Sequence, residues 1–138
     1  MRIRQRAAGV IPLRPDPDGW RLLILRCYQS WDFPKGVVEP GEELLATARR
    51  EALEEAALDD LVFAWGDVSV DTALYSRGKV ATYFLARTGR QDVVLPVNPA
   101  LGHPEHHEGR WVTLDEAAVL LPARLQPVLA WARQALGA

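Results

Sequence analysis

The sequence predicts an α/β/α sandwich built on a central mixed β-sheet. Two observations support this fold: apolar runs of strand length recur along the chain, and helical spacing appears in the middle and at the C-terminus. A chain of 138 residues with 49% hydrophobic composition has enough apolar side chain for one core. We therefore expect a single domain over residues 1–138.

The first half of the chain predicts a hairpin, a loop and a helix. Residues 7–13 and 20–27 are apolar runs on either side of the turn-rich residues 14–19, which is typical of a β-hairpin. Residues 31–41 are expected to be a loop. A helix should follow, because the next apolar residues share one stripe at helical spacing: Leu44, Leu45, Ala48, Ala52 and Ala56.

Strand signals return after this helix. Residues 61–75 and 79–87 each contain them, with Ser76-Arg77-Gly78 as the turn, so we expect the two segments to pair. Residues 92–109 contain three prolines and are too irregular for a regular element. A loop of this length is usually functional.

The C-terminal part predicts a short strand and a helix. Residues 110–113 have the composition of a strand, and residues 115–136 have helical spacing. Pro122 and Pro127 are the expected breaks in the helix, since proline lacks the N–H that a helix interior needs.

Charge and composition exclude several classes of protein. A formal charge of −2 and a pI near 5.9 argue against a general binder of duplex nucleic acid or of membrane surfaces. Cys27 is the only cysteine, so no disulfide forms within the chain. Arg2, Arg4 and Arg6 interrupt the N-terminus and no long apolar run follows, so we expect no secretory signal, no membrane span and a cytoplasmic location.

Three glutamates in the predicted helix form the main candidate site. Glu51, Glu54 and Glu55 stand at positions i, i+3 and i+4, within about 100° of the helix circumference. Such like-charge pairs cost on the order of 0.2–0.5 kcal/mol each, which a hard cation such as Mg²⁺ would offset. A solvated acidic face is the alternative. The neighbouring apolar stripe favours the metal site, because the glutamates border the buried side of the helix.

The segment before the helix supports the same site. Residues 33–36 and 39–42 are typical of a tight loop that leads into a helix. Gly36 has no side chain, so its backbone carbonyl is free to lie near the glutamates.

Residues 36–58 resemble the Nudix box, the loop-helix motif of the Nudix hydrolases. The matching positions are Gly36, Glu42, Arg50, Glu51, Glu54, Glu55 and Leu58. Two positions depart from the pattern: Ala52 replaces a larger aliphatic residue, and Ala57 replaces the glycine expected near the helix end. Alanine tolerates the left-handed cap conformation less well than glycine.

The resemblance implies a Mg²⁺-dependent pyrophosphohydrolase with the Nudix α/β/α fold, with Mn²⁺ as a substitute ion. Glu51, Glu54 and Glu55 would act in catalysis and, with the Gly36 carbonyl, hold the metal. Arg50 would lie away from the carboxylate arc and pair with Glu42, which braces the loop. For Glu42, favourable electrostatics at a helix N-terminus is a second interpretation, worth about 0.3–1 kcal/mol.

A second acidic segment, residues 105–111, resembles the loop that gives many Nudix enzymes a further metal ligand or general base. We favour Glu105 over Glu108 as the assisting carboxylate, because its offset from Trp111 is more similar to that in the diadenosine tetraphosphate hydrolases of this family. The three histidines in this region, His103, His106 and His107, allow a transition-metal site. Solvated side chains in a surface loop are the preferred interpretation, since no cysteine or paired helical spacing supports the metal.

The substrate is expected to be a small nucleotide. Residues 31–42 are similar to those of the dinucleoside polyphosphate hydrolases in this family, exemplified by diadenosine tetraphosphate hydrolase, although Val37 stands where these typically have histidine. Lys35 is a candidate phosphate contact, with a solvated loop lysine as the alternative. Tyr75 is a candidate for stacking on a base, with strand packing as the alternative. Tyr83 is interpreted as a core residue.

Four other functions stay open. The enzyme could act on nucleoside triphosphates, on nucleotide sugars or on 5′-triphosphate RNA ends, the last suggested only by Arg2, Arg4 and Arg6 on one face of an N-terminal strand. A non-catalytic ligand-sensing module with the same fold is the alternative from another class. The intact glutamates argue against it. A monomer and a homodimer are both compatible with the sequence.

Overall fold

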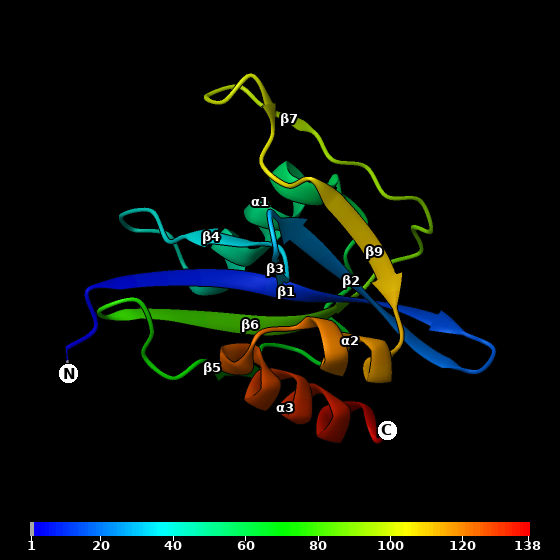
Figure 1. Ribbon diagram of the computed structural model, residues 1–138. Helices are drawn as coiled ribbons and strands as arrows, with labels where there is room; N and C mark the ends of the chain where they lie inside the picture. Colours follow the sequence, from blue (N-terminus) through cyan, green and yellow to red (C-terminus); the bar gives the residue numbers. More distant parts are fainter. Residues whose placement is uncertain (1) are drawn as a thin grey trace.

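A seven-stranded mixed sheet runs through the computed structural model, which describes residues 2–138 (Figure 1). Its central strand, β1 (Gln5–Asp16), runs parallel to β6 (Lys79–Arg87). The opposite edge of β1 pairs antiparallel with β4 (Lys35–Val37) along the first part of the strand and with β2 (Gly19–Cys27) at its end. The predicted hairpin is therefore confirmed, with both strands longer than expected.

The remaining strands extend the sheet on both sides. β2 also pairs antiparallel with β3 (Ser30–Asp32) and β9 (Glu108–Val112), and β6 pairs antiparallel with β5 (Ser69–Asp71). A separate ladder joins β7 (Val97–Asn98) to β8 (His103–Pro104). One parallel pair among antiparallel ones makes the large sheet mixed, as predicted.

Helices cover both faces of this sheet (Figure 1). Helix α1 (Leu44–Ala56) lies on one face. On the other lie α2 (Leu114–Leu120), a 3₁₀ turn η1 (Ala123–Leu125) and α3 (Gln126–Leu136). The α/β/α sandwich predicted from the sequence is confirmed.

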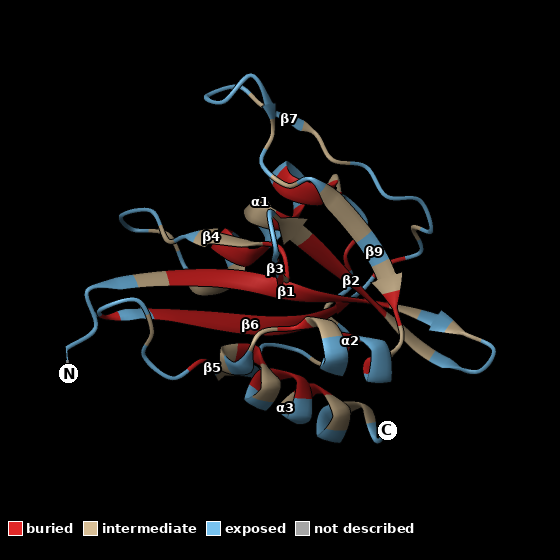
Figure 2. Ribbon diagram, viewed as in Figure 1, coloured by how far each residue is buried: buried red, intermediate tan, exposed pale blue. Residues whose placement is uncertain are grey.

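Alternation along the inner strands produces two apolar clusters, one for each face. On β2, Leu22 and Ile24 pack toward α2 and α3, whereas Leu23 and Leu25 pack toward α1. Burial is concentrated on β1, β2 and β6 between the helix layers (Figure 2). Tyr83 belongs to the α3-side cluster and is fully buried, as expected for a core residue.

Several segment boundaries differ from the predictions. Residues 31–41, expected to be a loop, contain parts of β3 and all of β4. Residues 61–75 form the three-residue strand β5 and isolated bridges at Val62 and Tyr75 instead of a continuous strand, because the segment meets β6 only at separated points. The predicted turn over residues 76–78 is confirmed by the Tyr75–Lys79 bridge that closes it.

The chain ends also differ in detail. Pro122 does separate α2 from the last helix, but Pro127 lies in the first turn of α3 and does not break it. Of the three N-terminal arginines, only Arg6 lies in β1, so they do not share one strand face. Among residues 2–138, no helix combines the length and apolar composition needed to cross a membrane.

Ala57 ends α1 in the left-handed conformation, with φ 56° and ψ 30°. The Ala57 N–H donates to the Leu53 carbonyl and the Leu58 N–H donates to the Ala52 carbonyl, so the turn expected of a glycine forms with alanine. An L-residue with a Cβ pays roughly 1–2 kcal/mol for this conformation.

We expect Ala57→Gly to raise the free energy of unfolding by about 1 kcal/mol, because glycine adopts this conformation without strain. Urea unfolding would measure the change. Ala130→Gly, at an exposed position inside α3, is the control and should lower stability by about 0.5–1 kcal/mol. Equal destabilisation by both changes would contradict the interpretation of the cap.

Candidate active site

A pocket of about 720 Å³ lies where α1, β4, the turn before β6 and the β7–β8 region meet. It brings together seven residues that the sequence singled out: Lys35, Gly36, Glu51, Glu54, Glu55, Tyr75 and Glu105. These residues span seventy positions of the chain, so only the fold makes them neighbours. The acidic patch predicted on the helix is thus one wall of an open pocket.

Gly36 on β4 lies against the carboxylate of Glu51. A Cβ built at Gly36 would overlap all three carboxyl atoms of Glu51, so any side chain here would displace that carboxylate. The φ of Gly36 is not in the left-handed region, and the glycine is required for space instead of for conformation. Strand β4 therefore packs directly against the carboxylate of Glu51 on α1.

Glu55 is the most enclosed of the three helix glutamates. The residue is 8% exposed, and the Lys35 N–H lies 3.4 Å from its Oε1. Burial, together with a hydrogen bond to Glu51 and the negative charge of Glu105, raises the pKa of Glu55 far above its usual range. Three carboxylates crowded in this way form a site that favours a positive charge.

Glu42 and Arg50 form the brace expected between the loop and the helix. Arg50 Nε donates to Glu42 Oε2 at 2.8 Å and Nη2 to Oε1 at 3.0 Å, while the Thr47 hydroxyl donates to Oε1 at 2.6 Å. These bonds from Arg50 and Thr47, with one from the Glu39 N–H, lower the pKa of Glu42 to about 2.

The expectation that Arg50 would lie away from the carboxylate arc was wrong. Its Nη1 lies 2.8 Å from Glu51 Oε1 and 3.4 Å from Glu54 Oε2. The long arginine side chain bends along the helix surface and bridges the brace to two glutamates. Glu54, whose side chain is 56% exposed, lies at the rim of the group.

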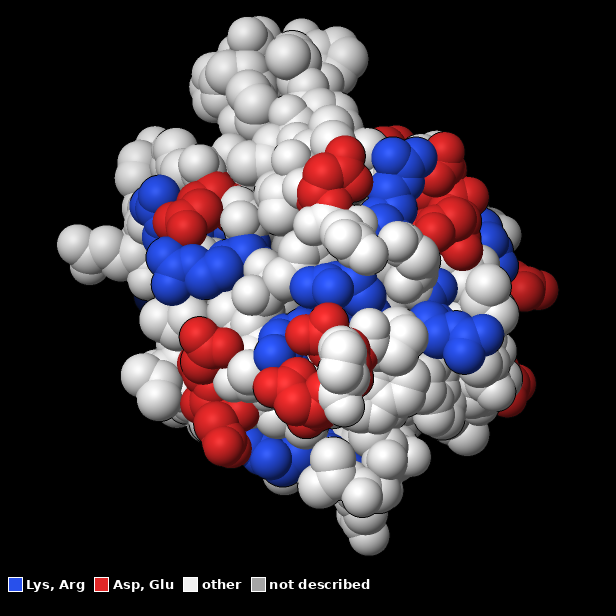
Figure 3. Space-filling view, turned by 90° about the vertical axis from the view of Figure 1, so that its right-hand side faces the viewer, with Lys and Arg blue, Asp and Glu red and all other residues white. Residues whose placement is uncertain are grey.

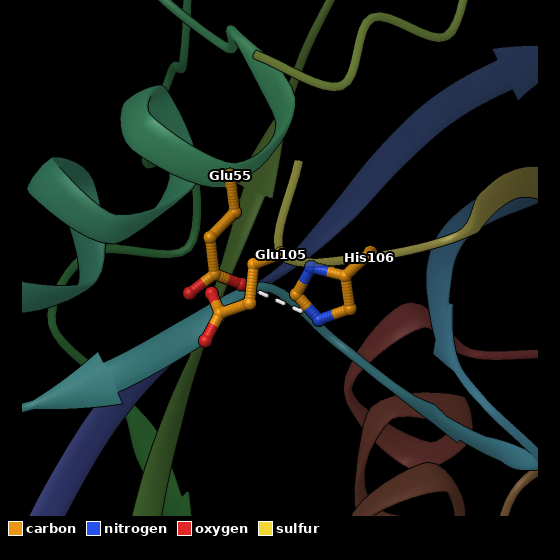
Figure 4. A group of neighbouring side chains, drawn as sticks. All are labelled: Glu55, Glu105 and His106. Carbon is orange, nitrogen blue, oxygen red and sulfur yellow. Dashed lines mark ion pairs between the residues drawn. The ribbon is translucent and has the colours of Figure 1, made fainter. Parts of the chain in front are cut away.

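The position of Glu105 differs sharply from that of Glu108. Glu105 lines the pocket, and its carboxylate lies near Glu55 (Figure 4). Glu108 lies on β9 in ion pairs with Arg26 at 3.1 Å and Arg110 at 2.9 Å, and hydrogen bonds from these arginines lower its pKa. Of these two carboxylates, Glu105 is the one at the pocket, and its role as the assisting carboxylate stays a prediction.

The three histidines do not form one metal site, but one of them is not solvated either. His103 is exposed, and His107 accepts a hydrogen bond at 2.8 Å from the Tyr28 N–H. The His106 side chain is 12% exposed and lies 3.8 Å from Glu55. For His106 the interpretation as a solvated loop residue was wrong, because the loop folds back against α1.

This set of donors suits a hard divalent cation. Carboxylate oxygens from α1 and from the β8–β9 connection face one another, and ionising Glu55 in this setting is unfavourable without a nearby positive charge. Glu51 and Glu55 are placed to hold such an ion, with Glu54 at the edge and Glu105 opposite Glu55.

Comparison with known proteins identifies the family. A family-wide sequence profile described as the NUDIX domain matches residues 3–132. The chain belongs to the Nudix family. The brace, the glutamates and Gly36 are accordingly the parts of its Nudix box. Residues 92–109 lie outside the box, and the expectation that they contain no regular element was wrong, because they form β7, β8 and the start of β9.

Curated relatives and solved structures agree with this assignment. A bis(5′-nucleosyl)-tetraphosphatase [asymmetrical] from Sus scrofa is 38% identical, with 83% of each chain covered, and one from Caenorhabditis elegans is 30% identical, with 81% of each covered. The crystal structure of a C. elegans Ap4A hydrolase binary complex matches with a TM-score of 0.80 and 28% identity over 95% of this chain and 98% of that one. The Nudix hydrolase RenU from M. smegmatis matches at 0.72 and 22% identity, which shows the shared fold.

Tyr75 and Lys35 flank the Nudix box in this pocket. The Tyr75 ring lies under the guanidinium of Arg124, 4.6 Å from its centroid, and packs partly against the core. Lys35 Nζ lies 3.6 Å from Asp32 Oδ2, and its side chain is 26% exposed. Both interpretations of each residue remain compatible with these positions: a ligand contact and local packing.

Sequence reasoning missed Asp32, whose carboxylate contacts both Lys35 of the pocket and the buried Tyr83. Its carboxylate accepts hydrogen bonds from the Tyr83 hydroxyl at 2.7 Å and from Arg124 at 2.8 Å, and pairs with Lys35. Asp32 thereby links the core to the residues that flank the box. Its place within residues 31–42, which resemble those of the dinucleoside polyphosphate hydrolases, was the one available signal.

Residues of the β7 region also line the pocket and were not named as site residues: Pro96, Val97, Asn98 and Pro99. They belong to the irregular segment that the sequence identified only as functional. No periodicity marks them, since the loop reaches the pocket through its tertiary path.

Proposed function

We propose that this Nudix enzyme is a Mg²⁺-dependent hydrolase that cleaves dinucleoside polyphosphates asymmetrically, with diadenosine tetraphosphate as the leading substrate. The observation that supports it most strongly is the pocket in which Tyr75 and Lys35 lie with the carboxylates of α1 and Glu105. Relatives named bis(5′-nucleosyl)-tetraphosphatase [asymmetrical] cover most of the chain at up to 38% identity, which supports the substrate class.

Each group of pocket residues has a separate proposed role. Glu51, Glu54 and Glu55, with the Gly36 carbonyl, would hold the divalent ion, with Mn²⁺ as a substitute. When bound, the ion withdraws charge from phosphate oxygens and makes water more acidic. Glu105 would accept the proton of the attacking water. Lys35 would offset phosphate charge, and the Nudix-box brace of Glu42 and Arg50 would hold the loop in place.

Product analysis tests the proposal directly. The purified chain would be incubated with Mg²⁺ and diadenosine tetraphosphate, with parallel samples of ADP-ribose, a nucleoside triphosphate and 5′-triphosphate RNA. Cleavage to ATP and AMP at a higher kcat/KM than the other substrates supports the proposal. Faster cleavage of another substrate would be consistent with hydrolysis at the Nudix box but would contradict the assignment of diadenosine tetraphosphate as the substrate. If none of the compounds is cleaved, a ligand-sensing role is favoured.

An RNA 5′ end is the second candidate substrate, because one observation favours it. Arg2, Arg4 and Arg77 line a hollow beside the pocket, and the Arg4 N–H bonds to the Gly78 carbonyl at 2.7 Å. The neighbouring residues Gln5 and Tyr75 line the pocket itself. Basic side chains at this edge would suit a phosphodiester chain. By contrast, the face in Figure 3 has acidic and basic side chains interspersed.

The Tyr75 ring is expected to contribute to substrate binding. Tyr75→Ala should raise KM for diadenosine tetraphosphate about tenfold, because stacking on a base is worth about 1–3 kcal/mol. Tyr75→Phe keeps the ring and should keep KM, as measured by initial rates. An unchanged KM in Tyr75→Ala would mean that Tyr75 does not bind the substrate and only packs against Arg124.

We also propose a cellular location and an assembly state. A cytoplasmic enzyme acting on a small nucleotide, as a monomer or a homodimer, agrees with the single cysteine and the charge of −2. Neither property supports binding to duplex nucleic acid or to a membrane surface.

A further inference from the structure

Asp32 connects the buried core to the edge of the pocket through both of its carboxylate oxygens. Its Oδ1 accepts hydrogen bonds from the Tyr83 hydroxyl at 2.7 Å and from the Phe33 N–H at 2.6 Å. Its Oδ2 accepts one from Arg124 Nη2 at 2.8 Å and lies 3.6 Å from Lys35 Nζ. Because Tyr83 and Phe33 are buried, the core fixes this carboxylate on one side, and two cations meet it on the other.

Arg124 extends this connection to Tyr75. It lies in the 3₁₀ turn η1 between α2 and α3, where the next residue, Leu125, is fully buried in the core. Its guanidinium carbon stands over the Tyr75 ring, 4.6 Å from the centroid, which is within the range of a cation–π contact. The guanidinium therefore joins Asp32 to a ring that lines the pocket.

Hydrogen bonding alone does not explain the position of this guanidinium. Its Nη1 is buried and has no hydrogen-bond partner among residues 2–138. A buried donor without a partner is unfavourable, and a turn of the group toward solvent would relieve this cost. The bond to Asp32 and the face of the Tyr75 ring are the contacts that hold the group in place.

Tyr75 lies beside a turn that fixes its backbone but not its ring. Two hydrogen bonds join the backbone of Tyr75 to that of Lys79, at 3.0 Å and 2.9 Å, across residues 76–78. These bonds leave the side-chain torsions of Tyr75 free. The residue is only partly buried, so the core alone does not enclose the ring. The guanidinium of Arg124 on one face of the ring restricts those torsions.

We infer that Arg124, anchored by Asp32, is a positioning residue that holds the Tyr75 ring ready to stack on a base of the substrate. The inference deepens the proposed dinucleoside polyphosphate activity and rests on it. Arg124 is not among the residues that line the pocket, so it acts through Tyr75. A ring that is already ordered loses less conformational entropy when a ligand binds. The effect should therefore appear in substrate binding and not in the chemical step.

Steady-state kinetics of Arg124→Met test the inference. Methionine keeps an unbranched side chain but removes the cation that lies on the ring. We expect KM for diadenosine tetraphosphate with Mg²⁺ to rise about fivefold and kcat to change by less than about twofold. Arg133→Met is the matched control, because it removes an arginine of α3 that pairs with Asp115 at 2.7 Å outside the pocket. It should keep both constants.

A double-mutant cycle separates the positioning of Tyr75 from a general structural role. In a Tyr75→Ala background, Arg124→Met should raise KM no further, because the ring that Arg124 holds is absent. An increase that persists in this background would mean that Arg124 acts through Lys35 or through the fold, and the inference would be wrong. An unchanged KM in the single variant Arg124→Met would overturn it as well.

A second variant, Arg124→Lys, serves if the methionine variant does not fold. Lysine keeps a cation for Asp32 but lacks the planar group that lies on the ring, so KM should rise about twofold. The protein has three tyrosines, and the Tyr75 ring signals in NMR spectra should shift in this variant but not in Arg133→Met. Unmoved Tyr75 signals and a wild-type KM in folded Arg124→Lys would contradict the positioning role.

Failure of the inference can be told apart from failure of the proposed function. If Arg124→Met cleaves diadenosine tetraphosphate with the wild-type KM, the inference alone is wrong. If the unmutated protein does not cleave this compound, the proposed reaction is wrong, and calorimetric binding of AMP, which carries one base and one phosphate, replaces KM. Weaker AMP binding in Arg124→Met, with no further loss in the Tyr75→Ala background, would then support the positioning role. Equal AMP binding by the variant and the unmutated protein would overturn it.

Discussion

Glu55→Gln is expected to lower kcat with Mg²⁺ by about 10²-fold or more while the fold remains intact. The amide keeps the size of the carboxyl group but removes the negative charge that the proposed ion needs. Steady-state rates on diadenosine tetraphosphate would measure the loss. Glu43→Gln, at an exposed position before α1 with no side-chain cap bond, is the control and should keep wild-type turnover.

The same substitution should change the pH dependence of stability in the metal-free protein. The pKa of Glu55 is raised in the folded state above its ordinary value of 4.5, mainly by burial. The folded protein then binds this proton more tightly than the unfolded chain, so stability falls as pH rises above about 4.5 toward the folded-state pKa. Glutamine carries no titrating proton and removes this loss.

Unfolding midpoints in urea between pH 5 and pH 8 would show the effect. Metal-free wild-type protein should lose stability across this range, and Glu55→Gln should lose less of it. Near-normal turnover in a folded Glu55→Gln protein would show that Glu55 is not a ligand in the proposed metal site. Identical pH profiles for the two proteins would show that burial does not perturb this carboxyl group.

Local pattern explains why the box helix could be predicted so fully from the sequence. Helical spacing alone places Glu51 and Glu55 beside the apolar stripe, and the stripe decides which side of α1 is buried. The brace between Glu42 and Arg50 was implied by the resemblance. The contact of Arg50 with Glu51 was missed because it depends on a flexible side chain and not on spacing.

Non-local contacts explain what the sequence left undecided. The parallel register of β1 with β6 joins residues more than seventy positions apart, and no periodicity specifies such a pair. Glu105 and Glu108 differ in role because β9 begins at Glu108, which leaves Glu105 on the loop that reaches α1. The same loop path buries His106, although its composition is typical of a solvated segment.

Gly36→Ala is expected to reduce turnover about as strongly as the loss of a carboxylate, although it removes no charge. The new Cβ would overlap the carboxylate of Glu51, and either β4 or that side chain must move. A displacement of about 1 Å in a catalytic group can cost about 10²-fold in rate. We therefore expect kcat to fall by about this factor, measured with Mg²⁺ under saturating substrate.

Gly89→Ala provides a matched control for this substitution. Its Cβ would meet only Asp60 Oδ2 at 3.6 Å, which is an ordinary contact, and its φ is not in the left-handed region. Both variants add one methyl group, but only the first one lies between β4 and α1. Wild-type turnover in both would mean that the loop can move without disturbing the glutamates, and the close approach of Gly36 to Glu51 would then have no role in holding the site together.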